Sequence, residues 1–113
     1  MKLAHRIALV TGSSSGIGRG VAIAFAREGA DVVVNYPTAD QATNAREVCE
    51  AITALGRRAI AVQADVAEEA DAKRMCAVAL DKFGHIDILV NNAGIAAAAP
   101  VQDIPVEQWD RVI

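Results

Sequence analysis

Aromatic residues and cysteines are scarce in this chain. Only 4% of its 113 residues are aromatic although 53% are hydrophobic, so the core has to be built from aliphatic side chains and alanine. Such a core lets helices lie close to a sheet, which favours a layered α/β protein over a β-sandwich or a disordered chain. Cys49 and Cys76 lack Cys-x-x-Cys spacing, so reduced core thiols are expected, with a disulfide as the alternative.

Signals for membranes, nucleic acids and metals are also missing. No apolar run reaches the roughly 18 residues of a membrane span, and residues 2–6 lead into a strand pattern without a cleavage site. We therefore expect a cytoplasmic protein. The net charge of −3 argues against nucleic acid as the main partner. His5 and His85 have no second ligand at metal spacing, so no metal site is expected.

Short apolar, largely β-branched runs alternate with longer stretches of helical period. Because these runs lack polar alternation, they are typical of a parallel sheet covered on both faces. Right-handed crossovers then give an α/β, doubly wound sheet with helices on both faces. The predicted strands are residues 7–10, 32–34, 59–62 and 86–90.

Three helices are predicted between these strands, and each is expected to end at a glycine. The glycines are Gly29, Gly56 and Gly84. Residues that recur every three or four positions are expected to face the sheet. In chain order they are Ile17, Val21 and Phe25; then Ala45, Val48, Cys49, Ile52 and Leu55; and then Ala72, Cys76, Ala79, Leu80 and Phe83.

The end of the chain predicts an incomplete domain. A loop containing Pro100 is expected to lead to a last helix from about Pro105, with Trp109, Val112 and Ile113 on its apolar face. No C-terminal helix signal follows, and the fourth strand would be left as an unpaired apolar edge. Residues 1–113 are therefore expected to be the N-terminal portion of a single domain that is truncated after the fourth strand.

A glycine- and serine-rich segment, Thr11-Gly12-Ser13-Ser14-Ser15-Gly16-Ile17-Gly18, joins the first strand to the first helix. The unpaired N–H groups and positive dipole of a helix N-terminus can hold a pyrophosphate. Glycines allow the turn and the close approach of the phosphates. The spacing is Gly-x-x-x-Gly-x-Gly, and no Lys-Ser/Thr pair follows as in a P-loop. The segment predicts a phosphate site, with a simple turn as the alternative.

With Asn91-Asn92-Ala93-Gly94 after the fourth strand, this segment resembles the short-chain dehydrogenase/reductase family over the whole chain. The three residues between Gly12 and Gly16 are similar to the compact members. The Val-Val-Val-Asn-Tyr run at 32–36 resembles the branch of glucose 1-dehydrogenases and 3-oxoacyl-carrier-protein reductases. The resemblance implies a Rossmann-type fold and NAD(P)-dependent hydride transfer between an alcohol and a carbonyl.

The resemblance also implies roles for individual residues. The three loop glycines would shape the pyrophosphate site, and Ile17 would lend its backbone N–H to the phosphates. Asp65 would accept from the adenine amino group, with Val66 beside the ring; a helix N-cap is the alternative for Asp65. Asn91, with the two residues after Asn92, would line the nicotinamide-side ribose; a strand-ending turn is the alternative. The expected cofactor-binding set is Gly12, Ser14, Ser15, Gly16, Ile17, Gly18, Asn35, Tyr36, Asp65, Val66, Asn91, Ala93 and Gly94.

The choice between NAD and NADP depends on the carboxyl end of the second strand. An acidic residue there binds the ribose 2′-hydroxyl of NAD, whereas an arginine accommodates the 2′-phosphate of NADP. Residues 35–37, Asn-Tyr-Pro, carry neither charge, and Asp31 opens the strand at its other end. Since no carboxylate repels a phosphate, the sequence favours NADP, with Ser14, Tyr36 and Thr38 as hydrogen-bonding residues.

The catalytic residues that the resemblance implies, a serine, a Tyr-x-x-x-Lys pair and an asparagine, cannot be assigned. All serines lie in the phosphate loop, and the only tyrosine, Tyr36, has no lysine four residues after it. The chain alone is expected to be inactive, and the complete protein is expected to act on a small molecule as a homo-oligomer. A non-catalytic nucleotide-binding module and a nonfunctional fragment are the alternatives.

Overall fold

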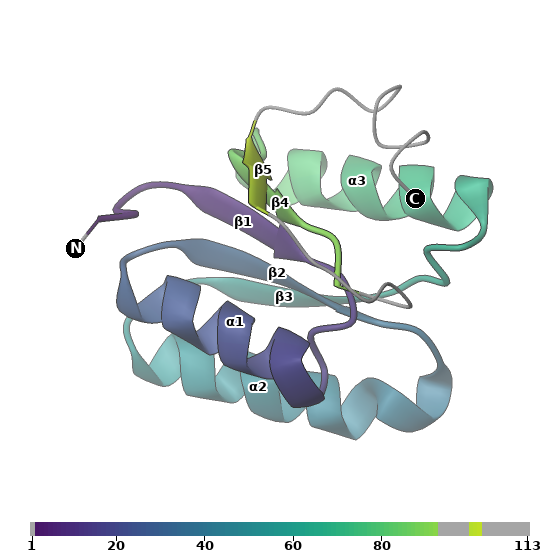
Figure 1. Cartoon of the computed structure of the whole chain (residues 1–113), viewed down its shortest axis with the longest axis horizontal. Coiled ribbons are helices and arrows are strands. Elements are labelled where there is room, and N and C mark those ends of the chain that lie inside the picture. Colours follow the sequence, from purple (N-terminus) through teal and green to yellow (C-terminus); the bar gives the residue numbers. More distant parts are fainter. Residues whose placement is uncertain (1, 93–99, 103–113) are drawn as a thin grey trace.

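The computed structural model describes residues 2–92 and the backbone of residues 100–102. One five-stranded sheet has the order β3-β2-β1-β4-β5, in which the first four strands are parallel and β5 is antiparallel to β4 (Figure 1). The predicted doubly wound parallel sheet is therefore confirmed. The elements are β1 (Ile7–Val10), α1 (Gly16–Arg27), β2 (Asp31–Tyr36), the 3-10 turn η1 (Ala39–Gln41), α2 (Ala42–Ala54), β3 (Ala59–Gln63), α3 (Glu69–Phe83), β4 (Ile88–Val90) and β5 (Pro100–Gln102).

The central strand β1 is buried on both faces. Helices α1 and α2 cover one face of the sheet and α3 covers the other (Figure 1). Successive side chains of a strand point to opposite faces. Ile7 and Leu9 accordingly pack in the cluster beneath α3, whereas Ala8 and Val10 pack beneath α1 and α2. This alternation between two cores explains why the strand is continuously apolar.

Helix α1 presents a different face to the sheet from the one predicted. Its buried residues are Gly18, Ala22 and Ala26, whereas Ile17 is 78% exposed. Val21 and Phe25 are only partly buried, at the margin of the core. The predicted spacing of four residues is correct, but each buried residue lies one position after the predicted one. The small side chains at these positions allow the helix to approach the strands closely.

The other two helices also differ from prediction at single positions. In α2 the buried residues are Ala45, Val48 and Ile52, as predicted, but Cys49 is only partly buried and Leu55, at the C-cap, is 41% exposed. In α3 the prediction missed Met75, which is fully buried, and wrongly placed Leu80 inside, where it is 39% exposed. The predicted buried face is therefore too wide in α2, and in α3 it differs from the observed face by one residue.

Strand β4 is shorter than the predicted 86–90 and begins at Ile88. The Asp87 carboxylate accepts a hydrogen bond from the backbone N–H of Ile7 at 2.8 Å. That carboxylate takes the place of a carbonyl from the neighbouring strand, so regular ladder pairing begins only after it. His85 and Arg6 also contact the Asp87 carboxylate, at 2.9 and 3.5 Å.

The expectation of a loop around Pro100 and of an unpaired edge at β4 is wrong. Residues Pro100–Gln102 form β5, which pairs with β4 in the register Ile88 to Gln102 and Val90 to Pro100. A proline is tolerated at the first position of an edge strand because it does not have to donate to the ladder there. The predicted last helix with Trp109, Val112 and Ile113 lies outside the described residues, as do Ala93 and Gly94.

The corrected face of α3 can be tested by two truncations on the same helix. Met75→Ala is expected to lower the free energy of unfolding by about 2–4 kcal/mol because it leaves a cavity in the core. Leu80→Ala is expected to change it by less than about 1 kcal/mol because the side chain already contacts solvent. Urea denaturation followed by circular dichroism measures both, and equal losses would contradict the assignment.

Candidate functional site

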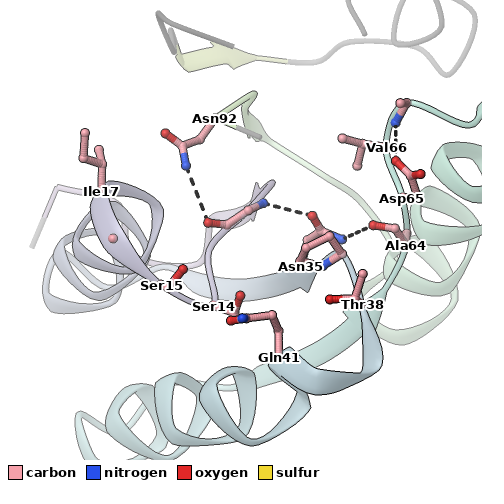
Figure 2. Close-up of a pocket in the computed structure, with 14 residues that line it drawn as sticks. Ser14, Ser15, Ile17, Asn35, Thr38, Gln41, Ala64, Asp65, Val66 and Asn92 are labelled. Carbon is pink, nitrogen blue, oxygen red and sulfur yellow. Dashed lines mark hydrogen bonds between the residues drawn. The ribbon is translucent and has the colours of Figure 1, made fainter. Parts of the chain in front are cut away.

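A cleft of ≈ 780 Å³ opens at the carboxyl ends of the parallel strands (Figure 2). The chain leaves β1 toward β2 on one side and returns to β4 on the other, so this end of β1 is the topological switch point at which open α/β sheets bind ligands. Four segments, one at the carboxyl end of each parallel strand, contribute its lining. The lining residues are Gly12, Ser14, Ser15, Gly16 and Ile17; Asn35, Pro37, Thr38 and Gln41; Ala64, Asp65, Val66 and Ala67; and Asn92.

The segment between β1 and α1 is built for close backbone approach. Gly12 and Gly16 have φ angles of 61° and 60°, in the left-handed region that strongly favours glycine. Ser15, the N-cap of α1, makes no capping hydrogen bond with its side chain. The first N–H groups of α1 are therefore not capped by that serine, and the positive end of the helix dipole faces the cleft. This arrangement can hold an anion.

Gly18 differs from the other two glycines of the segment because it is needed for close packing. A Cβ atom there would lie 2.3 Å from the carbonyl oxygen of Gly12 and 2.7 Å from Nδ2 of Asn92. Only a residue without a side chain lets α1 pack this tightly against the loop. Gly18 does not line the cleft; it sets the position of the helix whose N-terminus does.

Asn35 is 1% exposed and connects three parts of the site. Its Oδ1 accepts a hydrogen bond from the backbone N–H of Gly12 at 2.9 Å. Its Nδ2 donates to the carbonyl oxygens of Val62 and Ala64 at 3.3 and 3.1 Å. Because these bonds use both ends of the amide, the role of the Asn35 side chain is to hold the loop between β1 and α1 against β2 and β3.

Ser13, which the sequence did not single out, completes this attachment. Its hydroxyl donates to the carbonyl oxygen of Val10 at 2.6 Å and accepts from the backbone N–H of Asn35 at 3.0 Å. Its own N–H donates to the Asn35 carbonyl oxygen at 3.0 Å. The serine is fully buried, which explains why one of the three loop serines faces away from the cleft.

The two asparagines after β4, Asn91 and Asn92, have different positions and hydrogen-bond partners. Asn92 borders the cleft, and its Nδ2 donates to the Gly12 carbonyl oxygen at 3.5 Å. Asn91 is buried behind the cleft, where the Thr11 hydroxyl donates to its Oδ1 at 3.3 Å. The Thr11 hydroxyl in turn accepts from the Asn92 N–H at 2.8 Å. Nδ2 of Asn91 is buried and has no hydrogen-bond partner among the described residues.

Asp65 forms a turn at the edge of the cleft. Its Oδ1 accepts from the backbone N–H of Ala67 at 3.0 Å, and its own N–H donates to Asp71 Oδ2 at 2.9 Å. The N-cap of α3 is Glu68, so the N-cap alternative for Asp65 is wrong. The exposed carboxyl group of Asp65 is left beside Val66 on the wall of the cleft (Figure 2).

The structure brings most of the predicted binding residues together. Those that line the cleft are Gly12, Ser14, Ser15, Gly16, Ile17, Asn35, Asp65 and Val66. Tyr36 does not line it; this side chain packs at the margin of the core beneath α1 and α2. Gly18 and Asn91 support the site from behind, and Ala93 and Gly94 lie outside the described residues.

Gln41 and Asn92 border the cleft although the sequence reasoning did not select them. For Asn92 a signal existed, since it belongs to the motif that was recognised, but its contact with Gly12 depends on how two distant loops meet. For Gln41 there was no signal in the sequence, because the η1 turn that brings this residue to the cleft has no distinctive sequence pattern.

Other kinds of site find no support in the described part of the chain. No group of three or more His, Cys, Asp or Glu side chains there is arranged to hold a metal ion. Within the same residues, no helix combines the length and apolar character needed to cross a membrane. Burial raises the pKa of the Cys49 thiol, which therefore stays protonated, on α2 and away from the cleft.

A doubly wound parallel sheet with a glycine-rich turn at its switch point defines a Rossmann-type dinucleotide-binding fold. Residues 6–113 match the short chain dehydrogenase family, and the chain belongs to this family. It is 44% identical over 110 residues to a hydroxynaphthalene reductase-like protein, Arp2, of Metarhizium acridum. That alignment covers 97% of this chain but only 40% of the relative.

Solved structures show the same partial coverage. A short chain dehydrogenase from Burkholderia cenocepacia in complex with NADP is 43% identical, with a TM-score of 0.80 over 97% of this chain and 44% of that one. A blue fluorescent protein from a metagenomic library in complex with NADPH is 36% identical, with a TM-score of 0.81 over 98% of this chain and 45% of that one. The chain thus spans less than half the length of these relatives.

The packing role of Gly18 can be separated from helix propensity by a second glycine of α1. Gly18→Ala is expected to lower the free energy of unfolding by at least about 2 kcal/mol, because its Cβ meets backbone that cannot yield. Gly20→Ala is the control: its Cβ would have nothing within 4 Å, so stability is expected to rise by about 0.5–1 kcal/mol. Thermal denaturation distinguishes them, and a stable Gly18→Ala variant would contradict the close approach.

Proposed function

We propose that residues 1–113 form the N-terminal, cofactor-binding portion of one Rossmann-fold domain in an NAD(P)-dependent oxidoreductase. The observation that carries this proposal is the N-terminus of α1, uncapped by the Ser15 side chain, at the edge of a cleft and behind two glycines with positive φ. Helix N-termini of this kind bind phosphate groups through backbone N–H groups and the helix dipole. The cleft volume of ≈ 780 Å³ lies in the range of small-molecule sites.

The lining residues can be matched to the parts of a dinucleotide. Ile17 offers its backbone N–H to the pyrophosphate, and the absence of side chains at Gly12 and Gly16 leaves room for it. Asp65 offers a carboxylate oxygen to the adenine amino group, with Val66 against the ring. Asn91, Ala93 and Gly94 are proposed for the nicotinamide-side ribose; Asn91 would act from behind the cleft, as the buried neighbour of Asn92.

NADP is the proposed cofactor. No acidic residue from the carboxyl end of β2 lines the cleft, so no carboxylate there repels a 2′-phosphate. Asp31 stands at the opposite end of that strand, where it forms a salt bridge of 2.9 Å with Arg58. The two solved relatives described above contain NADP and NADPH, which supports the same choice.

The proposed reaction is hydride transfer between an alcohol and a carbonyl. The nicotinamide supplies the hydride chemistry when it is bound, and the residues of this chain orient the dinucleotide and hold its phosphates. No catalytic residue is assigned: the chain has no Tyr-x-x-x-Lys sequence, and its serines are confined to the phosphate loop. A small-molecule substrate, a homo-oligomer and a cytoplasmic location are proposed for the complete protein.

A non-catalytic nucleotide-binding module is the second candidate, since residues 1–113 themselves contain no Tyr-x-x-x-Lys sequence. Both candidate functions use the same cleft. They differ only in whether the complete protein places a proton donor beside the bound cofactor.

Cofactor binding is tested at Gly16, which lines the cleft. Gly16→Ala is expected to weaken NADPH binding about tenfold or more, because the new methyl group lies where the phosphates approach and the positive φ is strained. Its Cβ would meet no protein atom within 4 Å, so a loss of about 1–2 kcal/mol of stability is expected from backbone strain alone. NADPH fluorescence titration measures binding, with Gly20→Ala as the control.

Binding of neither NADPH nor NADH by the folded wild-type chain would refute the cofactor proposal. Unchanged NADPH binding in Gly16→Ala would show that the phosphates do not approach this glycine.

The absence of catalytic residues is tested by turnover. The 113-residue chain with NADPH and a panel of aldehydes, ketones and quinones is expected to consume NADPH no faster than the chain-free blank, because no group in the cleft is assigned to protonate the carbonyl oxygen. Absorbance at the wavelength of the reduced nicotinamide measures this. Turnover that depends on the chain would show that its own residues complete an active site.

A further inference from the structure

The part of the cleft beneath the end of β2 is lined by neutral polar side chains. Ser14 comes from the phosphate loop, Thr38 from the segment after β2, and Gln41 from the end of η1. Figure 2 shows the amide end of Gln41 beside Ser14, on the side of the cleft away from Val66 and Asp65. In the proposed binding mode this is the region of the adenosine ribose, since Asp65 and Val66 lie at the adenine.

The amide of Gln41 is held in one orientation by the first turn of α2. Its Oε1 accepts a hydrogen bond from Nδ2 of Asn44 at 2.9 Å. Both residues are half-buried, which limits alternative positions of the two side chains. Because Oε1 is engaged with Asn44, the group that remains to serve the cleft is Nε2, which carries two hydrogens and can only donate.

Thr38 does not supply an equivalent donor. Its hydroxyl donates to a carboxylate oxygen of Asp40, which is the acidic residue of this turn. Asp40 is not among the residues that line the cleft, so the hydroxyl hydrogen of Thr38 is engaged with a group outside the lining. Of the turn residues 38–41, Gln41 is therefore the one placed to donate a hydrogen bond into this part of the cleft.

We propose that Gln41 is the residue that selects the 2′-phosphate of NADP over the 2′-hydroxyl of NAD. This inference rests on the proposed function and assigns the specificity of that same cleft. A primary amide donates charge-assisted hydrogen bonds to a phosphate, and these are stronger than bonds to a neutral hydroxyl. Neither an arginine nor an acidic residue of the described chain lines this region, so the discrimination depends on an uncharged donor.

The experiment changes the charge of Gln41 and leaves its contact with α2 in place. In Gln41→Glu one carboxylate oxygen still accepts from Asn44, while the other replaces the donor with a negative charge. The 113-residue chain is titrated with NADPH and with NADH, and its fold is checked by circular dichroism and thermal denaturation. Gln63→Glu is the matched control, since Gln63 is exposed on β3 and does not line the cleft.

The expected result is a rise of about tenfold or more in the Kd for NADPH in Gln41→Glu, with the Kd for NADH changed less than about threefold. Gln63→Glu is expected to bind both coenzymes as the wild type does. Gln41→Met, which keeps the length but removes the donor, is expected to weaken NADPH binding selectively by a smaller factor. It also provides the answer if the glutamate variant does not fold.

Equal effects on the two coenzymes, or no effect in either Gln41 variant, would overturn the role of Gln41 while leaving the cofactor site intact. Failure of the folded wild-type chain to bind either coenzyme would instead overturn the proposed function itself. A wild-type preference for NADH would likewise overturn the assignment, because Gln41 would then select nothing.

Discussion

The backbone of Gly12 is held from both sides by two asparagines, one within β2 and one after β4. Asn35 accepts from its N–H at 2.9 Å, and Asn92 donates to its carbonyl oxygen at 3.5 Å. The same carbonyl lies against Gly18, where any Cβ would approach it to 2.3 Å. The loop, β2, the end of β4 and α1 therefore meet at one backbone position, and the orientation of the helix N-terminus toward the cleft follows from that meeting.

This constraint also accounts for the composition of the helix packing. A helix that passes so close to a loop cannot present large side chains to the sheet, and the buried face of α1 is Gly18, Ala22 and Ala26. Bulkier residues such as Phe25 are moved to the margin of the core. The scarcity of aromatic residues fits this packing of small side chains, and closely packed interiors tolerate little added volume.

Polar groups at the site are mostly engaged with the protein and not with the cleft. Asn35, Ser13 and Thr11 are fully or almost fully buried and use their side chains to hold the strand ends together. A loop fixed in this way loses little conformational entropy when a phosphate binds, so ordering of the loop reduces the binding free energy only slightly. The groups left to recognise a ligand are backbone N–H groups and a small number of side chains, among them Asp65 and Gln41.

Much of this arrangement was accessible from local pattern. Apolar runs with glycine punctuation predicted four parallel strands and three helices, because periodicity and helix ends depend on neighbours within a few residues. The spacing of Gly12, Gly16 and Gly18 predicted the glycine turn between β1 and α1 for the same reason, and the phosphate site there stays a prediction. The rotation of the buried face of α1 by one residue and the exchange of Leu80 for Met75 in α3 were not predictable, since they depend on how closely whole layers approach.

Three features came from contacts between segments that are far apart along the chain. Asn35 lines the cleft as predicted, but its amide hydrogen-bonds to Gly12, Val62 and Ala64, which the sequence did not indicate. The carboxylate of Asp87 shortened β4 by bonding to Ile7. Gln41 reaches the cleft only because η1 folds the chain back over the end of β2. Sequence periodicity records which residues share a face, whereas the partner of a given polar atom is set by the meeting of distant loops, and no local pattern encodes that meeting.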